Sequence, residues 1–325
     1  MATYKGIQGY SVQKLSSDPG TLSEVVGQLW YNSSIGKFKI SVQGAGAWAA
    51  GGDLNTARRG IAVGGAGTRD TALCIGGDSP SKTEVELYDG TAWTEKGDLN
   101  QERAGLGAAG TSTAALAFTG NIGPLTAEVE SYDGSTWTEI QNITTARYEV
   151  AGAGIQTAAL CIGGLEPAVS GKTESWNGTS WTEKADLNTA RGALCAAGTS
   201  TAALVMGGSN PPPSTNLSEL WNGTSWTATP TLNTSRFGAG AGGTSTSAIT
   251  FLGYPPSFPT ATETWNGSSW TSVASAATGA GIGGGVAASK AAALAFGGNL
   301  GAPTDITTTQ EWSEPVYSIK TVTVS

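Results

Sequence analysis

Histidine is absent from the 325-residue chain, and this absence excludes several kinds of catalytic and metal centre. A Ser-His-Asp or Cys-His nucleophile cannot form without an imidazole base. Zinc, copper and non-haem iron sites that depend on imidazole ligands are excluded for the same reason. Carboxylates could still bind a hard cation, but the sequence shows no carboxylate cluster of that kind. We therefore expect no cofactor and no metal ion.

Charge is also scarce, because Asp, Glu, Lys and Arg make up 13% of the chain and the formal net charge is −8. Nucleic-acid binding needs basic stripes, so no nucleic-acid partner is expected. The most apolar stretch, residues 280–298, carries Lys290 near its middle, which argues against membrane insertion. The first residues lack the apolar core of a secretory signal, so none is expected. The three cysteines predict buried free thiols rather than a disulfide framework.

A repeat with a period of about 44 residues organises most of the chain. The sequence Trp-Asn-Gly-Thr-Ser-Trp-Thr occupies residues 176–182 and 221–227, and close variants begin at residues 88, 132 and 265. Spacings between the second aromatic residues are 45, 44, 44, 45 and 44. These residues are Trp48, Trp93, Trp137, Trp181, Trp226 and Trp270.

Each repeat predicts four β-strands. An arginine lies ten residues after the tryptophan, a strand of small residues follows, and an apolar strand then ends in glycine. A third strand carries Glu-x-aromatic, and Asn-Gly or Asp-Gly makes a tight hairpin to the fourth. Four-stranded units of this length repeated around an axis form a β-propeller. Such an axis also explains the 48 glycines, because little side-chain volume fits where the first strands meet.

The two ends of the repeat predict how the ring closes. Five copies contain all four strands, whereas the sixth runs from about residue 280 to Trp312 and lacks its fourth strand. We expect residues 47–49 near the N-terminus to supply that strand, because closure removes exposed strand edges. The sequence thus predicts an all-β, six-bladed propeller over residues 45–314, with a linear array or seven blades as alternatives.

The repeat resembles kelch-type propellers in its Gly-Gly after an apolar strand, its spaced aromatic residues and its arginine before the next strand. Residues 176–191 contain Trp-Asn-Gly-Thr-Ser-Trp-Thr-Glu and Leu-Asn-Thr-Ala-Arg, and in this they resemble kelch-like virion proteins of marine tailed bacteriophages. Residues 27–39 are similar to a short β-hairpin module of phage appendage proteins, and residues 319–325 to endings in that group. The resemblance implies a virion structural protein.

One arginine and one glutamate recur in five of the six repeats. The sixth repeat has Ala280 and Gln310 in their places. The loss of both in one repeat predicts structural ion pairs rather than the carboxylate-binding arginines of sialidase-like propellers. The expected pairs are Arg58 with Glu86, Arg103 with Glu130, Arg147 with Glu174, Arg191 with Glu219, and Arg236 with Glu263.

The connection after the second strand is the most irregular part of each repeat, while the hairpins hardly vary. In a propeller these connections share one face, and variable loops on a rigid scaffold are where recognition usually resides. Neutral drift is the alternative. Proline would pre-order these loops and lower the entropy cost of binding. The candidate recognition residues are Asp78, Pro80, Asn121, Pro124, Pro167, Asn210, Pro212, Tyr254, Phe258 and Asn299.

Residues 1–44 do not fit the repeat and predict a small N-terminal β module. A strand within residues 315–325 is expected to pair near it, because ring closure brings both ends together. The module is a candidate for docking to the virion, with a structural cap on the propeller as the alternative. The candidate docking residues are Tyr10, Trp30, Tyr31 and Phe38.

These observations predict a non-enzymatic virion protein that serves host attachment, with the tail or tail fibre as the favoured position. Capsid decoration and a lectin-like, carbohydrate-binding propeller are the alternatives. A glycan-cleaving enzyme would need a pair of carboxylates outside the repeat, and no pattern identifies one. The expected partners are other virion proteins and a host cell-surface glycan or protein, and a homo-oligomer is left open. The expected location is the virion, after synthesis in the host cytoplasm.

Overall fold

The computed structural model describes residues 12–62, 65–78, 80–210, 214–254, 260–281, 283–301, 304–314 and 317–323. The chain divides into two compact units. The small unit consists of Met1–Gly46 and Glu314–Ser325, and the large unit is Ala47–Ser313. β-Strands dominate both units, and in these described ranges the helical structure is limited to a single 3-10 turn, η1 (Leu22–Val25).

Among the residues that the structure describes, the large unit contains six four-stranded antiparallel sheets, and in each sheet the first strand pairs with the second, the second with the third and the third with the fourth. We number the sheets 1 to 6 in the order of their first strands. The first strands are β5 (Ala66–Thr68), β9 (Gly107–Thr111), β13 (Ala151–Ile155), β19 (Cys195–Gly198), β23 (Gly240–Thr244) and β27 (Gly284–Ser289). The second strands are β6 (Thr71–Ile75), β10 (Ala114–Phe118), β14 (Ala158–Ile162), β20 (Ala203–Met206), β24 (Ser247–Phe251) and β28 (Ala292–Phe296).

The outer strands of the sheets come from the hairpin of each repeat. The third strands are β7 (Val85–Tyr88), β11 (Val129–Tyr132), β17 (Thr173–Trp176), β21 (Ser218–Trp221), β25 (Thr262–Trp265) and β29 (Thr309–Ser313). The fourth strands are β8 (Trp93–Glu95), β12 (Trp137–Glu139), β18 (Trp181–Glu183), β22 (Trp226–Thr229), β26 (Trp270–Val273) and, in sheet 6, β4 (Ala47–Ala50).

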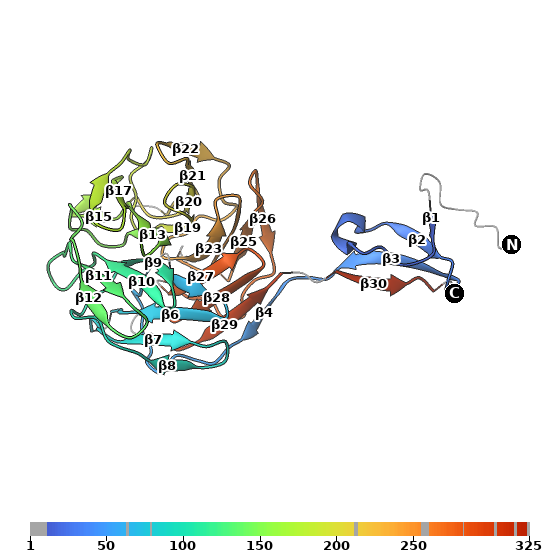
Figure 1. Cartoon of the computed structure of the whole chain (residues 1–325), viewed down its shortest axis with the longest axis horizontal. Helices are drawn as coiled ribbons and strands as arrows, with labels where there is room; N and C mark the ends of the chain where they lie inside the picture. The colour runs from blue at the N-terminus through green and yellow to red at the C-terminus, as the bar shows by residue number, and fades with distance from the viewer. Residues whose placement is uncertain are drawn as a thin grey trace. The chain divides into compact units, whose positions relative to one another are not determined.

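The six sheets are arranged around a common axis, with their first strands innermost (Figure 1). Neighbouring first strands contact one another in chain order, and β27 contacts β5. In sheet 6, β4 runs antiparallel to β29 and places Trp48 opposite Trp312. The all-β prediction is confirmed, and the architecture is β-propeller-like.

Second strands are buried along almost their whole length, because a neighbouring sheet covers each of their faces. Leu116, Leu160 and Leu204 on these strands have no exposed surface. Further out, the aromatic residue near the end of each third strand stands opposite the tryptophan of the fourth. The ring centroids of these cross-strand pairs lie 4.9–5.7 Å apart, which stabilises the pairing of the third and fourth strands.

The fourth-strand tryptophan also connects each sheet to the preceding one. In four of the six sheets, its indole N–H donates to the hydroxyl of the first residue of the preceding sheet's third strand. The donor–acceptor pairs are Trp93 with Thr309 (2.9 Å), Trp226 with Thr173 (3.1 Å), Trp270 with Ser218 (3.3 Å) and Trp48 with Thr262 (2.9 Å). Valine occupies the acceptor position in sheets 1 and 2, as Val85 and Val129, and the buried indole N–H groups of Trp137 and Trp181 have no partner among the described residues.

This difference between sheets predicts that Val129→Thr stabilises the protein. The new hydroxyl would accept from the indole of Trp181, and satisfying a buried donor contributes about 1 kcal/mol. Val150→Thr, at another fully buried valine of the same apolar cluster, is the control, and we expect it to cost about 1–3 kcal/mol. Chemical denaturation of both variants measures the difference. Equal losses of stability would contradict the role assigned to the threonine hydroxyl.

The small unit contains a four-stranded sheet of order β1-β2-β3-β30. β1 (Gln13–Leu15) pairs parallel to β2 (Leu29–Asn32), which pairs antiparallel to β3 (Lys37–Gln43). β30 (Tyr317–Thr321) then pairs antiparallel to β3, so both ends of the chain belong to one sheet. Asp18 accepts hydrogen bonds from Trp30 at 3.0 Å and from Asn32 at 2.8 Å, and these bonds lower the pKa of its carboxyl.

Candidate functional site

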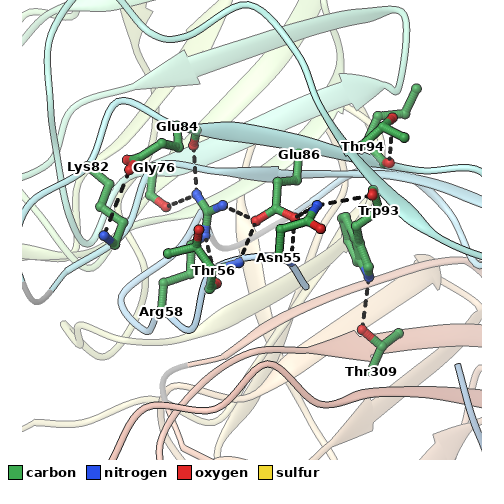
Figure 2. Close-up of polar contacts among 11 residues, drawn as sticks. Asn55, Thr56, Arg58, Gly76, Lys82, Glu84, Glu86, Trp93, Thr94 and Thr309 are labelled. Atoms are coloured by element: carbon green, nitrogen blue, oxygen red, sulfur yellow. Dashed lines mark hydrogen bonds and ion pairs between the residues drawn. The ribbon is translucent and has the colours of Figure 1, made fainter. Parts of the chain in front are cut away.

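A buried arginine pairs with a glutamate of the same sheet in sheets 1 to 5. Figure 2 shows this contact in sheet 1, where Arg58 donates to Glu86 and to the carbonyl oxygen of Glu84 at 2.8 Å. The other pairs are Arg103 with Glu130, Arg147 with Glu174, Arg191 with Glu219, and Arg236 with Glu263. All ten side chains are at most 3% exposed. The prediction of five ion pairs is confirmed.

Each of these glutamates also holds the loop that precedes the arginine. One carboxylate oxygen of Glu86 accepts from the backbone N–H and from the side-chain amide of Asn55, both at 2.8 Å (Figure 2). Asn100 and Asn188 make the same pair of contacts in sheets 2 and 4. Our sequence reasoning did not single out these asparagines. Their signal was the Leu-Asn-Thr-Ala-Arg pattern, in which the asparagine lies three residues before the arginine.

In sheet 6, uncharged groups hold the equivalent loop. The side-chain oxygen of Gln310 accepts from the backbone N–H groups of Ala277 at 2.9 Å and Thr278 at 3.1 Å. Its amide donates to the carbonyl oxygen of Thr278 at 2.9 Å. Since a glutamine beside Ala280 is enough to hold this loop, the pairs in the other sheets act as internal braces of the loops.

Each braced loop contributes to one bridged pair of residues per sheet, and the side chains of this pair vary from sheet to sheet. Directly after the glycine that closes the second strand, one residue forms a backbone bridge with the residue that follows the arginine position. The six bridged pairs are Arg59–Asp78, Ala104–Asn121, Tyr148–Leu165, Gly192–Ser209, Phe237–Tyr254 and Gly281–Asn299. Arg59 and Asp78 form an ion pair at 3.6 Å, whereas the rings of Phe237 and Tyr254 stack with centroids 5.2 Å apart. The backbone is thus repeated while the chemistry differs from sheet to sheet.

We call this end of the large unit the loop face, because it carries the braced loops and the connections between second and third strands. A cavity of about 360 Å³ opens there beside residues of sheets 1 to 3. Its lining includes Arg59, Asp78, Asn121, Tyr148 and Glu149. The volume lies at the lower end of the range for small-molecule pockets, about 300–1,000 Å³.

The residues two positions after the arginines form a chain of backbone hydrogen bonds that runs from sheet 1 to sheet 5. Gly105 donates to Gly60 at 2.7 Å, Glu149 to Gly105 at 2.7 Å, Ala193 to Glu149 at 2.8 Å, and Gly238 to Ala193 at 2.7 Å. All five have positive φ, between 48° and 62°. The equivalent residue of sheet 6, at position 282, lies outside the described residues. We call these five residues the axial ring.

A second, narrower cavity of about 90 Å³ is lined largely by glycine and alanine of the first strands. At several of the lining glycines, close packing against a neighbouring backbone leaves no room for a side chain. A Cβ added to Gly152 would lie 2.0 Å from the carbonyl oxygen of Ala108. This packing agrees with the sequence-based explanation of the glycine excess.

The predicted recognition residues are placed unevenly on the loop face. Exposed ones are Pro80, Pro124, Pro167 and Asn210, and half-buried ones are Asp78, Asn121 and Tyr254. Pro167 lies at the turn between two short strands, β15 (Leu165–Glu166) and β16 (Ala168–Val169). Pro212 and Phe258 lie outside the described residues. Asn299 is only 3% exposed and its side-chain oxygen is buried, so its prediction as a surface contact is wrong.

The predicted docking residues of the small unit differ in accessibility. Trp30 is 2% exposed, and its indole N–H is used by Asp18. It is a core residue of the unit, so the docking role expected of it is wrong. Tyr31 and Phe38 are half-buried, with ring centroids 5.1 Å apart. Tyr10 lies outside the described residues.

The thiols are buried and unreactive in character. Burial raises the pKa of Cys74 to about 12 and the pKa of Cys161 and Cys195 to about 11, which keeps all three protonated. Among the described residues, no three acidic or thiol side chains gather as a metal site. The same residues include no helix of the length and apolarity needed to cross a membrane.

Comparison with known proteins places the fold and nothing more specific. No protein-family model and no curated protein matches the sequence. Among solved structures, one titled "Structure of YjhT" is similar over 83% of this chain and 100% of its own length. The TM-score is 0.69 and the sequence identity is 13%. A likeness at this identity is one of fold alone.

Proposed function

We propose that this chain is a non-enzymatic binding protein of a tailed-bacteriophage virion, built as a six-bladed kelch-like propeller. The six four-stranded sheets, the contact between β27 and β5, and the pairing of β4 with β29 support a closed ring of six blades. The likeness of the repeat and of both chain ends to phage virion proteins supports the location.

The observation that carries a binding role is the variable position on the loop face. Six backbone bridges of the same kind carry six different pairs of side chains, and buried braces hold the loops beneath them. A rigid scaffold with varied side chains on one face is the arrangement by which proteins present recognition surfaces. In this proposal the loop face binds the host cell surface.

The small unit is the proposed attachment to the particle. Its sheet joins β3 from one chain end to β30 from the other, so it forms a compact body separate from the repeats. We favour the tail or its fibres as the site of attachment. The alternative is attachment to the capsid as a decoration protein.

Cryo-electron microscopy of intact particles tests the location. We expect density for this chain at the tail or tail fibre, with the small unit contacting a neighbouring virion chain. Density on the capsid surface would contradict the host-attachment role and would assign the chain to capsid decoration. Absence of the chain from purified particles would refute the virion assignment altogether.

A competition experiment tests the loop face directly. We expect the purified full chain to compete with particles for host cells and so to reduce adsorption. Three lysines placed on exposed loop residues should remove this competition, because they change charge where contact is made. Three lysines on the hairpins at the opposite strand ends should leave it unchanged. The loop changes are Pro124→Lys, Pro167→Lys and Asn210→Lys, and the control changes are Thr179→Lys, Thr224→Lys and Ser268→Lys. Equal competition by both variants would contradict the role of the loop face.

A further inference from the structure

Glu149 is the exceptional member of the axial ring. The other described members are glycine in three sheets and alanine in one, and a left-handed backbone suits residues with little or no side chain. Glu149 adopts φ 54° with a long, charged side chain. Backbone strain of this kind persists where surrounding structure enforces it, and it is concentrated at functional sites. The ring therefore contains one residue whose side chain needs an explanation other than the fold.

The carboxylate of Glu149 has no partner in the part of the chain that the structure describes. It forms neither a hydrogen bond nor an ion pair there, whereas the buried glutamates of the braces each accept several hydrogen bonds. Burial alone raises the pKa of the Glu149 carboxyl. A partly desolvated carboxylate without a partner is unfavourable, so a ligand that supplied donors would gain from binding here.

The nearest basic side chain in the cavity lining is already occupied. Arg59 lies 3.6 Å from Asp78 and 3.5 Å from Asp305, two carboxylates that share its charge. With Arg59, Asp78 and Glu149 as its charged residues, the lining has a net charge of −1. An anionic ligand would be repelled, whereas an ammonium group would neutralise Glu149 and donate up to three hydrogen bonds.

We propose that Glu149 binds the primary ammonium group of a small polar ligand in the cavity of the loop face. The proposal rests on the proposed function in one respect, namely that this face is the recognition surface. The cavity volume, about 360 Å³, limits the ligand to a small molecule or a single terminal group. Asn121 and Asp78 in the lining can bond to the hydroxyl groups of such a ligand.

Titration of the full chain with D-glucosamine and N-acetyl-D-glucosamine, followed by NMR or calorimetry in EDTA, tests this site. The two sugars differ in whether the amine is charged, so they form a matched pair of probes. We expect saturable binding of glucosamine and binding of the acetylated sugar weaker by about 30-fold, as for loss of one partner of a buried charge pair. No saturable binding of glucosamine, or equal binding of both sugars, would overturn the proposal.

Variants of Glu149 separate binding from folding. Glu149→Gly restores the glycine of the other sheets, so we expect glucosamine binding to fall by about 30-fold while the melting temperature rises by about 2–4 °C. Glu149→Gln should lose binding to a similar extent without the change in backbone. Glu166→Gln, at a loop-face carboxylate already paired with Lys172 at 3.1 Å, is the control and should bind normally. Unchanged binding by Glu149→Gly would refute the site.

The two proposals fail in different experiments. If glucosamine does not bind but the full chain still competes with particles for host cells, the amine site is wrong and the attachment role stands. If glucosamine binds through Glu149 but the chain does not compete, the site stands and the attachment role is wrong. Calcium ions that occupy the cavity in EDTA-free buffer, and so exclude glucosamine, would reassign the site to a metal ion and overturn the proposal.

Discussion

Replacing Arg147 by alanine is expected to destabilise the protein by about 3–5 kcal/mol, because it leaves a buried carboxylate without its counter-charge. Arg147 and Glu174 have no exposed surface, and their charged atoms lie 2.8 Å apart. Glu174 also accepts from the backbone N–H and hydroxyl of Thr144, so the loop before the arginine should loosen as well. Thermal denaturation should show a melting temperature lower by about 5–9 °C.

Sheet 6 supplies the natural control for this prediction. It has Ala280 and Gln310 where the other sheets have arginine and glutamate, and Gln310 still holds its loop. The double variant Arg147→Ala with Glu174→Gln copies that arrangement, and it removes the unpaired charge. We expect it to recover about half of the stability lost in Arg147→Ala, measured as a coupling energy in a double-mutant cycle. Purely additive losses would show that the two charges do not act as a pair.

The fold of the large unit was predictable because its sequence contains six copies of one repeat, which can be compared position by position. A residue type that recurs at one position in five copies and disappears together with its partner in the sixth identifies a pair, as for Arg236 and Glu263 against Ala280 and Gln310. Hairpins with Asn-Gly or Asp-Gly and opposed aromatic residues locate the outer strands without ambiguity. Comparison of copies therefore substitutes for the comparison of homologous chains.

The features that escaped prediction are those that the copies do not share. The parallel pairing of β1 with β2 and the burial of Trp30 belong to a segment with no repeat against which to check them. The sequence shows that residue 149 is a glutamate, but it does not show that this residue belongs to the axial ring. That membership depends on backbone hydrogen bonds between sheets, which sequence spacing does not reveal. Asn299 shares its loop position with the half-buried Asp78, Asn121 and Tyr254 and differs from them only in packing.

Replacing Trp48 by alanine is expected to destabilise the large unit by about 3 kcal/mol, near the lower end for tryptophan truncations because this side chain is half-buried. Trp48 is the main side-chain contact of β4, and no hairpin links β4 to sheet 6. Its ring lies 5.0 Å from that of Phe251 and 5.7 Å from that of Trp312, and its indole N–H donates to Thr262 at 2.9 Å. The loss removes contacts on both sides of the junction between sheets 5 and 6.

Trp137 provides the matched comparison, because its indole N–H has no partner in the part of the chain that the structure describes and its strand, β12, is joined to β11 by a short hairpin. Trp48→Phe should cost about 1 kcal/mol through the lost hydrogen bond, whereas Trp137→Phe should be close to neutral. A loosened β4 would also expose the edge of β29, and an unpaired strand edge promotes association between chains. We therefore expect Trp48→Ala to increase both proteolysis near residues 47–52 and aggregation on heating more than Trp137→Ala does. Equal sensitivity of the two variants would mean that the side chain of Trp48 does not hold β4 on the edge of sheet 6.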